Sequence, residues 1–71
     1  MKAAQLYRFL ASSLSPRERL IIELRYGLNG HIPHTQREIA AKLKISRSYV
    51  SRIEKKALET LRRQFESGEG R

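Results

Sequence analysis

The chain lacks cysteine altogether, and its apolar runs are short. Without cysteine it has no disulfide, no thiolate zinc site and no thiol catalysis, and the composition fits a reducing compartment. The longest run of large apolar residues covers only residues 20–22, which is far too short for a membrane span. A length of 71 residues allows at most one compact domain and leaves no room for a separate catalytic one. We therefore expect a small, soluble, cytoplasmic protein.

Basic side chains outnumber acidic ones, and they gather in the middle of the chain. Fifteen Lys and Arg stand against seven Asp and Glu, for a net charge of +8. Residues 35–63 alone carry nine basic and three acidic side chains. A concentrated positive field on a small domain points first to a polyanion, most often nucleic acid. Charge alone is equally compatible with a solvated face, so the spacing of the residues has to decide.

Apolar spacing and capping signals predict four helices and no strand. Apolar residues recur at steps of three and four, as on one face of a helix. Ser or Thr followed three residues later by Glu forms a capping box at Ser15 and Thr35, and Ser46 caps a last, longest helix. Gly27 can end a helix in the left-handed conformation. The expected helices cover about residues 3–14, 16–26, 36–43 and 47–65, in one domain of residues 1–66 with a disordered tail at 67–71.

The third and fourth expected helices form a helix-turn-helix. Three residues separate them, and the small Ala40 lets their backbones approach closely. The apolar contacts that lock the pair would be Ile39, Leu43, Ile45, Val50 and Ile53. On the last helix, the face that is left over carries polar, small or cationic residues, namely Arg47, Ser48, Ser51, Arg52 and Lys55. A helix in the major groove presents its first two turns to the bases, so we expect an all-α, four-helix DNA-binding domain without winged elements.

Four segments of the chain form a linked pattern. They are Leu-Ser-Pro-Arg-Glu-Arg at 14–19, Glu-Leu-Arg-Tyr-Gly-Leu at 23–28, Thr-Gln-Arg-Glu-Ile-Ala at 35–40 and Ser-Arg-Ser-Tyr-Val-Ser-Arg-Ile-Glu-Lys-Lys-Ala-Leu at 46–58. In order and spacing, these segments resemble region 4, the C-terminal domain, of bacterial RNA polymerase sigma factors, and most of all the sporulation sigma-K and sigma-E group. The resemblance covers about residues 10–65. It implies a domain that reads the promoter minus-35 element, contacts the flap of the polymerase β subunit and catalyses no reaction.

The resemblance also assigns roles to single side chains. The base-reading positions would be Arg47, Ser48, Ser51 and Arg52. The sugar-phosphate contacts would be Arg17, Arg25, Gln36, Arg37, Ser46, Tyr49 and Lys56, to which we add Lys55 from the exposed face. Housekeeping sigma factors typically carry glutamate and glutamine where this chain has Ser48 and Arg52, which leaves the exact promoter sequence open.

Several positions have a second interpretation. Arg17 and Arg25 can pair with nearby glutamates on helix surfaces, and Tyr49 can pack between helices. Lys44 stands where a helix-turn-helix usually has glycine, and a left-handed lysine there would cost on the order of 1 kcal/mol. The end of the apolar stripe is expected in the core, although part of it can stay exposed for the polymerase; its residues are Leu58, Leu61 and Phe65.

Other functional classes are alternatives with less support. A LuxR-type helix-turn-helix regulator shares the pattern at 14–19 but has a shorter connection before the third helix. A second alternative is a module that binds polymerase or an anti-sigma factor, with DNA contact secondary, and the sequence does not rule it out. A basic membrane helix fails, because the apolar stripe of the last helix is needed in the core and the chain has no tryptophan.

Metal, cofactor and catalytic sites are not expected. His31 and His34 form a lone His-x-x-His without cysteine or a third ligand, and no serine stands in a nucleophile motif. The expected partners are double-stranded promoter DNA, the polymerase core and an anti-sigma factor, with no membrane contact. We expect a monomer. We also expect a domain excised from a longer protein, because nothing in the chain resembles the family's minus-10-recognising region.

Overall fold

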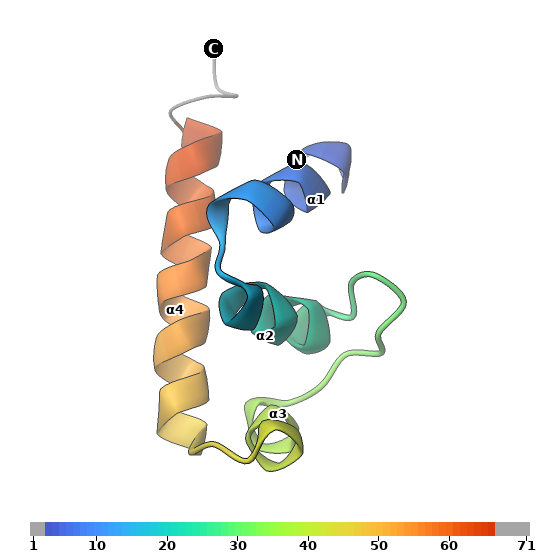
Figure 1. Ribbon diagram of the computed structural model, residues 1–71, viewed down its shortest axis with the longest axis vertical. Helices are drawn as coiled ribbons and strands as arrows, with labels where there is room; N and C mark the ends of the chain where they lie inside the picture. Colours follow the sequence, from blue (N-terminus) through green and yellow to red (C-terminus); the bar gives the residue numbers. More distant parts are fainter. Residues whose placement is uncertain (1–2, 67–71) are drawn as a thin grey trace.

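The computed structural model describes residues 3–66. They contain four helices, which are α1 (Ala3–Ser13), α2 (Pro16–Tyr26), α3 (Gln36–Leu43) and α4 (Arg47–Gln64). Helix α4 has 18 residues and is about 27 Å long. The three shorter helices lie one after another along it (Figure 1). Residues 3–66 contain no strand, which confirms the all-α fold class. Within the same residues, no helix has both the length and the apolar character that crossing a membrane requires.

Side-chain caps fix where α2, α3 and α4 begin. The Ser15 hydroxyl accepts from the Glu18 amide at 3.2 Å, and the Glu18 carboxylate accepts from the Ser15 amide at 3.0 Å. Thr35 and Glu38 repeat this capping box at 3.0 and 2.8 Å. Ser46 caps α4 through its hydroxyl. Helices α2 and α3 span the expected residues, whereas α1 and α4 each end one residue earlier than expected. The tail expected to be disordered lies outside the described residues.

Two helix ends depend on left-handed backbone. Gly27 ends α2 with a φ of 67°, and a Cβ there would lie 2.8 Å from ring atoms of Pro33. The missing side chain therefore lets the loop fold back onto the helix end. Lys44 ends α3 with a φ of 59°, which settles the conformation that the sequence left open at this position. This conformation costs on the order of 1 kcal/mol relative to glycine.

Two hydrophobic clusters are arranged along α4. The helix-turn-helix core joins α2, α3 and α4 and consists of Ile21, Leu24, Ile39, Ala40 and Val50. The α1 core joins α1, α2 and α4 and consists of Phe9, Leu10, Leu14, Ile22, Ala57 and Leu61. Phe65 extends the α1 core, since its ring meets that of Phe9 edge to face with centroids 4.8 Å apart. Each half of α4 thus has its own packing partner.

Candidate nucleic-acid interface

The first two turns of α4 leave their outer side open to solvent. The four predicted base-reading residues, Arg47, Ser48, Ser51 and Arg52, are all exposed. Val50, which stands between Ser48 and Ser51 in the sequence, is fully buried in the helix-turn-helix core. These four residues, called the reading surface below after their predicted role, therefore have packed side chains directly behind them. Guanidinium and hydroxyl groups in this place have the donors and acceptors that base edges require.

The predicted phosphate-contacting residues fall into two groups. Six of them are exposed: Arg17, Arg37, Ser46, Tyr49, Lys55 and Lys56. Lys56 has a partner on α2, because its Nζ lies 3.9 Å from the Glu18 carboxylate. Tyr49 is 41% exposed, so the helices do not enclose its ring. Arg25 and Gln36 form the second group, which is only partly exposed.

Arg25 and Gln36 are engaged by a carboxylate of α4. Glu54 is 6% exposed. Its Oε1 accepts a hydrogen bond from the Gln36 amide nitrogen at 2.8 Å and lies 3.5 Å from Arg25 Nε. Its Oε2 accepts from the Tyr26 hydroxyl at 2.9 Å. One buried carboxylate of α4 therefore joins the end of α2 and the start of α3 to that helix.

This arrangement changes what Arg25 and Gln36 can offer to DNA. Arg25 also donates from Nη1 to the carbonyl oxygen of His34 at 3.4 Å, which ties it to the loop before α3. One N–H group of the Gln36 amide is already used in the hydrogen bond to Glu54. The alternative interpretation, in which Arg25 pairs with a glutamate, describes the contact that the structure shows. Both side chains therefore connect parts of the helix-turn-helix, and only their remaining N–H groups are left for the predicted phosphate contact.

The Tyr26 phenol has an altered acidity in this cluster. Burial raises its pKa above the usual value, and the hydrogen bond to the Glu54 carboxylate raises the pKa further. The Arg25 guanidinium acts in the opposite direction. The phenol therefore keeps its proton, and with it the hydrogen bond to α4, at neutral pH.

Sequence reasoning did not single out Glu54 as a structural centre. A search for apolar spacing does not select charged residues as core positions, since glutamate is almost never buried unless it has a partner. One signal was present: Glu54 follows Val50 by four positions and so lies on the same side of the helix as this core residue. Its partners come from three separate segments, and only the fold brings them together.

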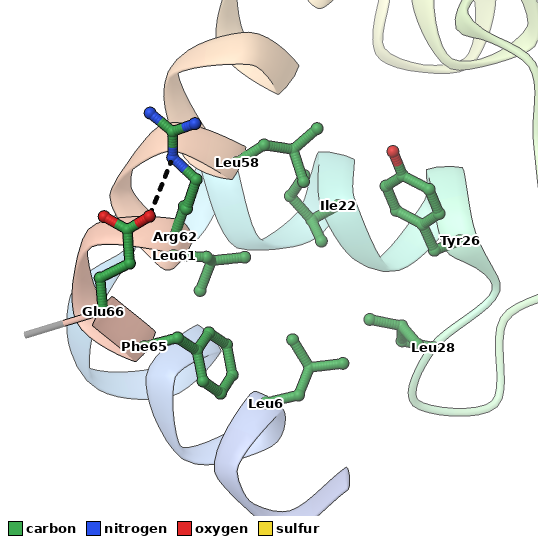
Figure 2. A pocket seen from close by; sticks show the side chains of 9 residues that line it. All are labelled: Leu6, Ile22, Tyr26, Leu28, Leu58, Leu61, Arg62, Phe65 and Glu66. Carbon is green, nitrogen blue, oxygen red and sulfur yellow. Dashed lines mark ion pairs between the residues drawn. The ribbon is translucent and has the colours of Figure 1, made fainter. Parts of the chain in front are cut away.

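A second surface feature lies at the other end of α4. An apolar groove of about 800 Å³ opens between α1, α2 and the C-terminal half of α4 (Figure 2). Its lining residues are Leu6, Ile22, Tyr26, Leu28, Leu58, Leu61, Arg62, Phe65 and Glu66. Leu58 was expected in the core but is 39% exposed as a groove wall. Arg62 and Glu66, the charged lining residues, pair with each other at 3.8 Å at one end of the groove (Figure 2).

The two histidines lie in the loop before α3, and each has a partner. His31 Nε2 lies 3.9 Å from the Glu23 carboxylate, and His34 Nδ1 lies 2.6 Å from the carbonyl oxygen of Ile32. Across residues 3–66, His, Cys, Asp and Glu side chains form no group of three or more that could hold a metal ion. The described part of the chain therefore offers no metal centre of that kind.

Known proteins match the chain over most of its length. The family described as sigma-70, region 4, matches residues 10–63. The RNA polymerase sigma-E factor of Clostridium acetobutylicum is 47% identical over 61 residues, which are 86% of this chain and 26% of the relative. The RNA polymerase sigma-K factor of Bacillus subtilis is 54% identical over 52 residues, which are 73% of this chain and 18% of the relative. No solved structure matches.

These matches fall on the residues that carry the resemblance. All four segments lie within the matched part of the chain, and sigma-E and sigma-K factors are among the relatives, as the sequence pattern indicated. The chain spans about a quarter or less of the length of these two relatives. By its helix-turn-helix fold and its sequence, the chain belongs to the sigma-70 region 4 family, a family of DNA-binding domains and not of enzymes.

Proposed function

We propose that this chain binds the minus-35 element of promoter DNA as the C-terminal domain of an RNA polymerase sigma factor and so directs transcription initiation. The observation that carries the proposal is the exposed, cationic start of α4, which is supported from behind by α2 and α3. It acts as a cytoplasmic monomer that needs no cofactor. A monomer of this size covers one short site, so tethering to polymerase supplies much of its occupancy.

Binding places the first two turns of α4 in the major groove. There Arg47 can donate two hydrogen bonds to guanine O6 and N7, and serine hydroxyls can bond either base type. The start of α3, with Arg37, faces the sugar-phosphate backbone and sets the register. Glu54 contributes indirectly, because it fixes the start of α3 against α4 through Gln36. The distance between the base-reading residues of α4 and the phosphate-contacting start of α3 is thereby fixed.

The apolar groove favours a second binding function, which is contact with the polymerase core. A contiguous apolar hollow on a domain this small is typical of a protein contact site. We place the flap of the polymerase β subunit there, and an anti-sigma factor would compete for the same groove. The groove lies along the C-terminal half of α4 (Figure 2), whereas the reading surface lies on its first two turns, so both partners can bind at once.

Selection of bound duplexes from a random pool tests the DNA function. We expect a guanine-containing consensus with a major-groove footprint. Titrating a labelled consensus duplex at rising salt should then give a log-log slope near −4.5, if about five phosphates are neutralised. Absence of saturable duplex binding would refute the function and leave the protein-interaction alternative.

Retention by purified polymerase core tests the groove. Leu58→Glu places a charge on the groove wall, where the side chain is already 39% exposed and folding is therefore preserved. This variant should no longer be retained by the polymerase core but should still bind the consensus duplex. Arg63→Ala, an exposed change on the same half of α4 that does not line the groove, is the control and should keep both. Unchanged retention of Leu58→Glu would place the polymerase contact elsewhere.

A further inference from the structure

A hollow of about 330 Å³ lies between the start of α2 and the first turns of α4. Three cationic side chains line it: Arg17 from α2, and Arg52 and Lys56 from α4. The Tyr49 ring lies beside them as a further part of the lining. Two helices therefore bring cations from distant parts of the sequence to one place.

Arg52 lies at the border between the reading surface and this hollow. At 100° per residue, it lies about 140° from Arg47 around the helix axis and about 40° from both Ser48 and Lys56, so its side-chain contacts decide between the two. The Arg52 guanidinium carbon is 5.9 Å from the centroid of the Tyr49 ring, which also lines the hollow. This cation–π contact favours a guanidinium that leans toward α2.

The charge in the hollow is not balanced by its one carboxylate. Glu18 lines the hollow, lies 3.9 Å from Lys56 and accepts from the Ser15 amide. Three cations against one anion leave a formal excess of two positive charges. A phosphodiester group carries one negative charge and acceptor oxygens that suit the guanidinium fork.

We propose that Arg52, together with Arg17 and Lys56, holds one backbone phosphate of the bound duplex. Sequence reading is then left to Arg47, Ser48 and Ser51, and Arg52 sets affinity instead of base preference. This assignment rests on the proposed binding of promoter DNA. It also replaces the base-reading role that the family resemblance implies for Arg52.

The test uses the consensus duplex and derivatives in which one phosphate at a time is replaced by an uncharged methylphosphonate. For the unaltered chain, one replacement should weaken binding through the loss of this contact. Arg52→Ala and Arg17→Ala should each bind the unmodified duplex roughly tenfold more weakly and should become insensitive to that same replacement. Arg52→Ala should also lose equal affinity for duplexes with single base-pair changes. Arg63→Ala removes the same charge from the far half of α4 and should keep the sensitivity.

Two results would overturn the assignment while leaving DNA binding intact. One is loss of preference at a single base pair in Arg52→Ala with the phosphate sensitivity retained, which would make Arg52 a base reader. The other is that Arg17→Ala and Arg52→Ala become insensitive to different phosphates. Failure of the unaltered chain to bind any selected duplex would instead overturn the proposed function, and this assignment with it.

Discussion

The two halves of α4 differ in how completely their surroundings cover them. In the N-terminal half, Val50 is fully buried behind an outer face of arginine and serine. In the C-terminal half, the apolar stripe continues past the core and opens into the groove, where Leu58 is 39% exposed. One helix therefore presents a charged surface at one end and an apolar surface at the other. The difference is consistent with the two proposed partners, a polyanion and a protein, whose binding should then be open to separate disturbance.

The strongest contrast between the two halves should appear in stability. Ile39→Ala removes a side chain with 0% exposure from the helix-turn-helix core, at a cost of about 2–5 kcal/mol. A domain of this size has only about 3–5 kcal/mol to lose, so much of the protein should unfold. Leu58→Ala, in the open groove, should cost about 0.5 kcal/mol. Urea unfolding followed by circular dichroism measures both, and equal losses would show that the halves are packed alike.

The next largest effect should come from the buried carboxylate. Glu54→Ala leaves the donors of Tyr26 and Gln36 without their acceptor and removes the charge opposite Arg25, at a cost of about 1–3 kcal/mol in unfolding free energy. Glu54→Gln keeps an acceptor oxygen but loses the charge opposite Arg25, so its loss should be smaller. The same urea experiment separates the variants. A Glu54→Ala variant as stable as the unaltered chain would mean that the cluster does not hold the helices together.

At the reading surface, the expected effect is on discrimination and not on folding. Arg47→Ala should lose about 1–3 kcal/mol of preference at one base pair, whereas Arg37→Ala should weaken all sequences alike. Both side chains are exposed, so the unfolding curves should stay unchanged. Titrations of consensus and singly changed duplexes give the comparison. Equal losses on matched and changed duplexes would remove Arg47 from the reading set.

The turn between α3 and α4 should allow a small gain. Lys44→Gly relieves the left-handed strain at a φ of 59° and should stabilise the domain by on the order of 1 kcal/mol. Lys44→Ala removes the same charge but keeps the Cβ that causes the strain, so it should show little of this gain. If both variants gain equally in urea unfolding, the gain comes from removing charge and not from the backbone.

The smallest effect concerns alkaline pH. Because the Tyr26 pKa is raised above its ordinary 10.0, the folded chain holds the phenolic proton more tightly than the unfolded chain. The stability from this difference is fully present below that ordinary value and is lost as the pH rises through the raised pKa. Unfolding free energies measured above pH 10 should therefore fall more steeply for the unaltered chain than for Tyr26→Phe. Parallel curves would mean that Tyr26 does not take part in the alkaline loss.

Local chemistry explains why the helices were predictable. The capping boxes at Ser15 and Thr35 each involve residues three positions apart, so the sequence already contains both members of each pair. Gly27 likewise adopts the left-handed conformation that its place after a helical segment indicated, whereas the left-handed conformation of Lys44 was left open by the sequence. Charge and the helix-turn-helix pattern indicated DNA binding, and the family resemblance added the promoter element, the polymerase contact and the roles of single side chains.

The cluster around Glu54 and the extent of the groove were not predictable from local patterns. Gln36 lies 18 positions before Glu54, and Tyr26 lies 28 before it, so no spacing rule connects them. A helical projection places Leu58 near the core side but does not show whether another helix reaches far enough to cover it. Both features depend on how α1 and α2 are placed against α4, which is a property of the whole fold.

The separation of the two surfaces is tested most directly by amide chemical shifts of the ¹⁵N-labelled chain, titrated with its selected duplex. We expect the largest shifts at Arg47, Ser48 and Ser51 and at the start of α3, with little change at the groove residues Leu58 and Leu61. Large shifts at the groove with an unmoved start of α4 would contradict the assignment of DNA to the charged half of this helix.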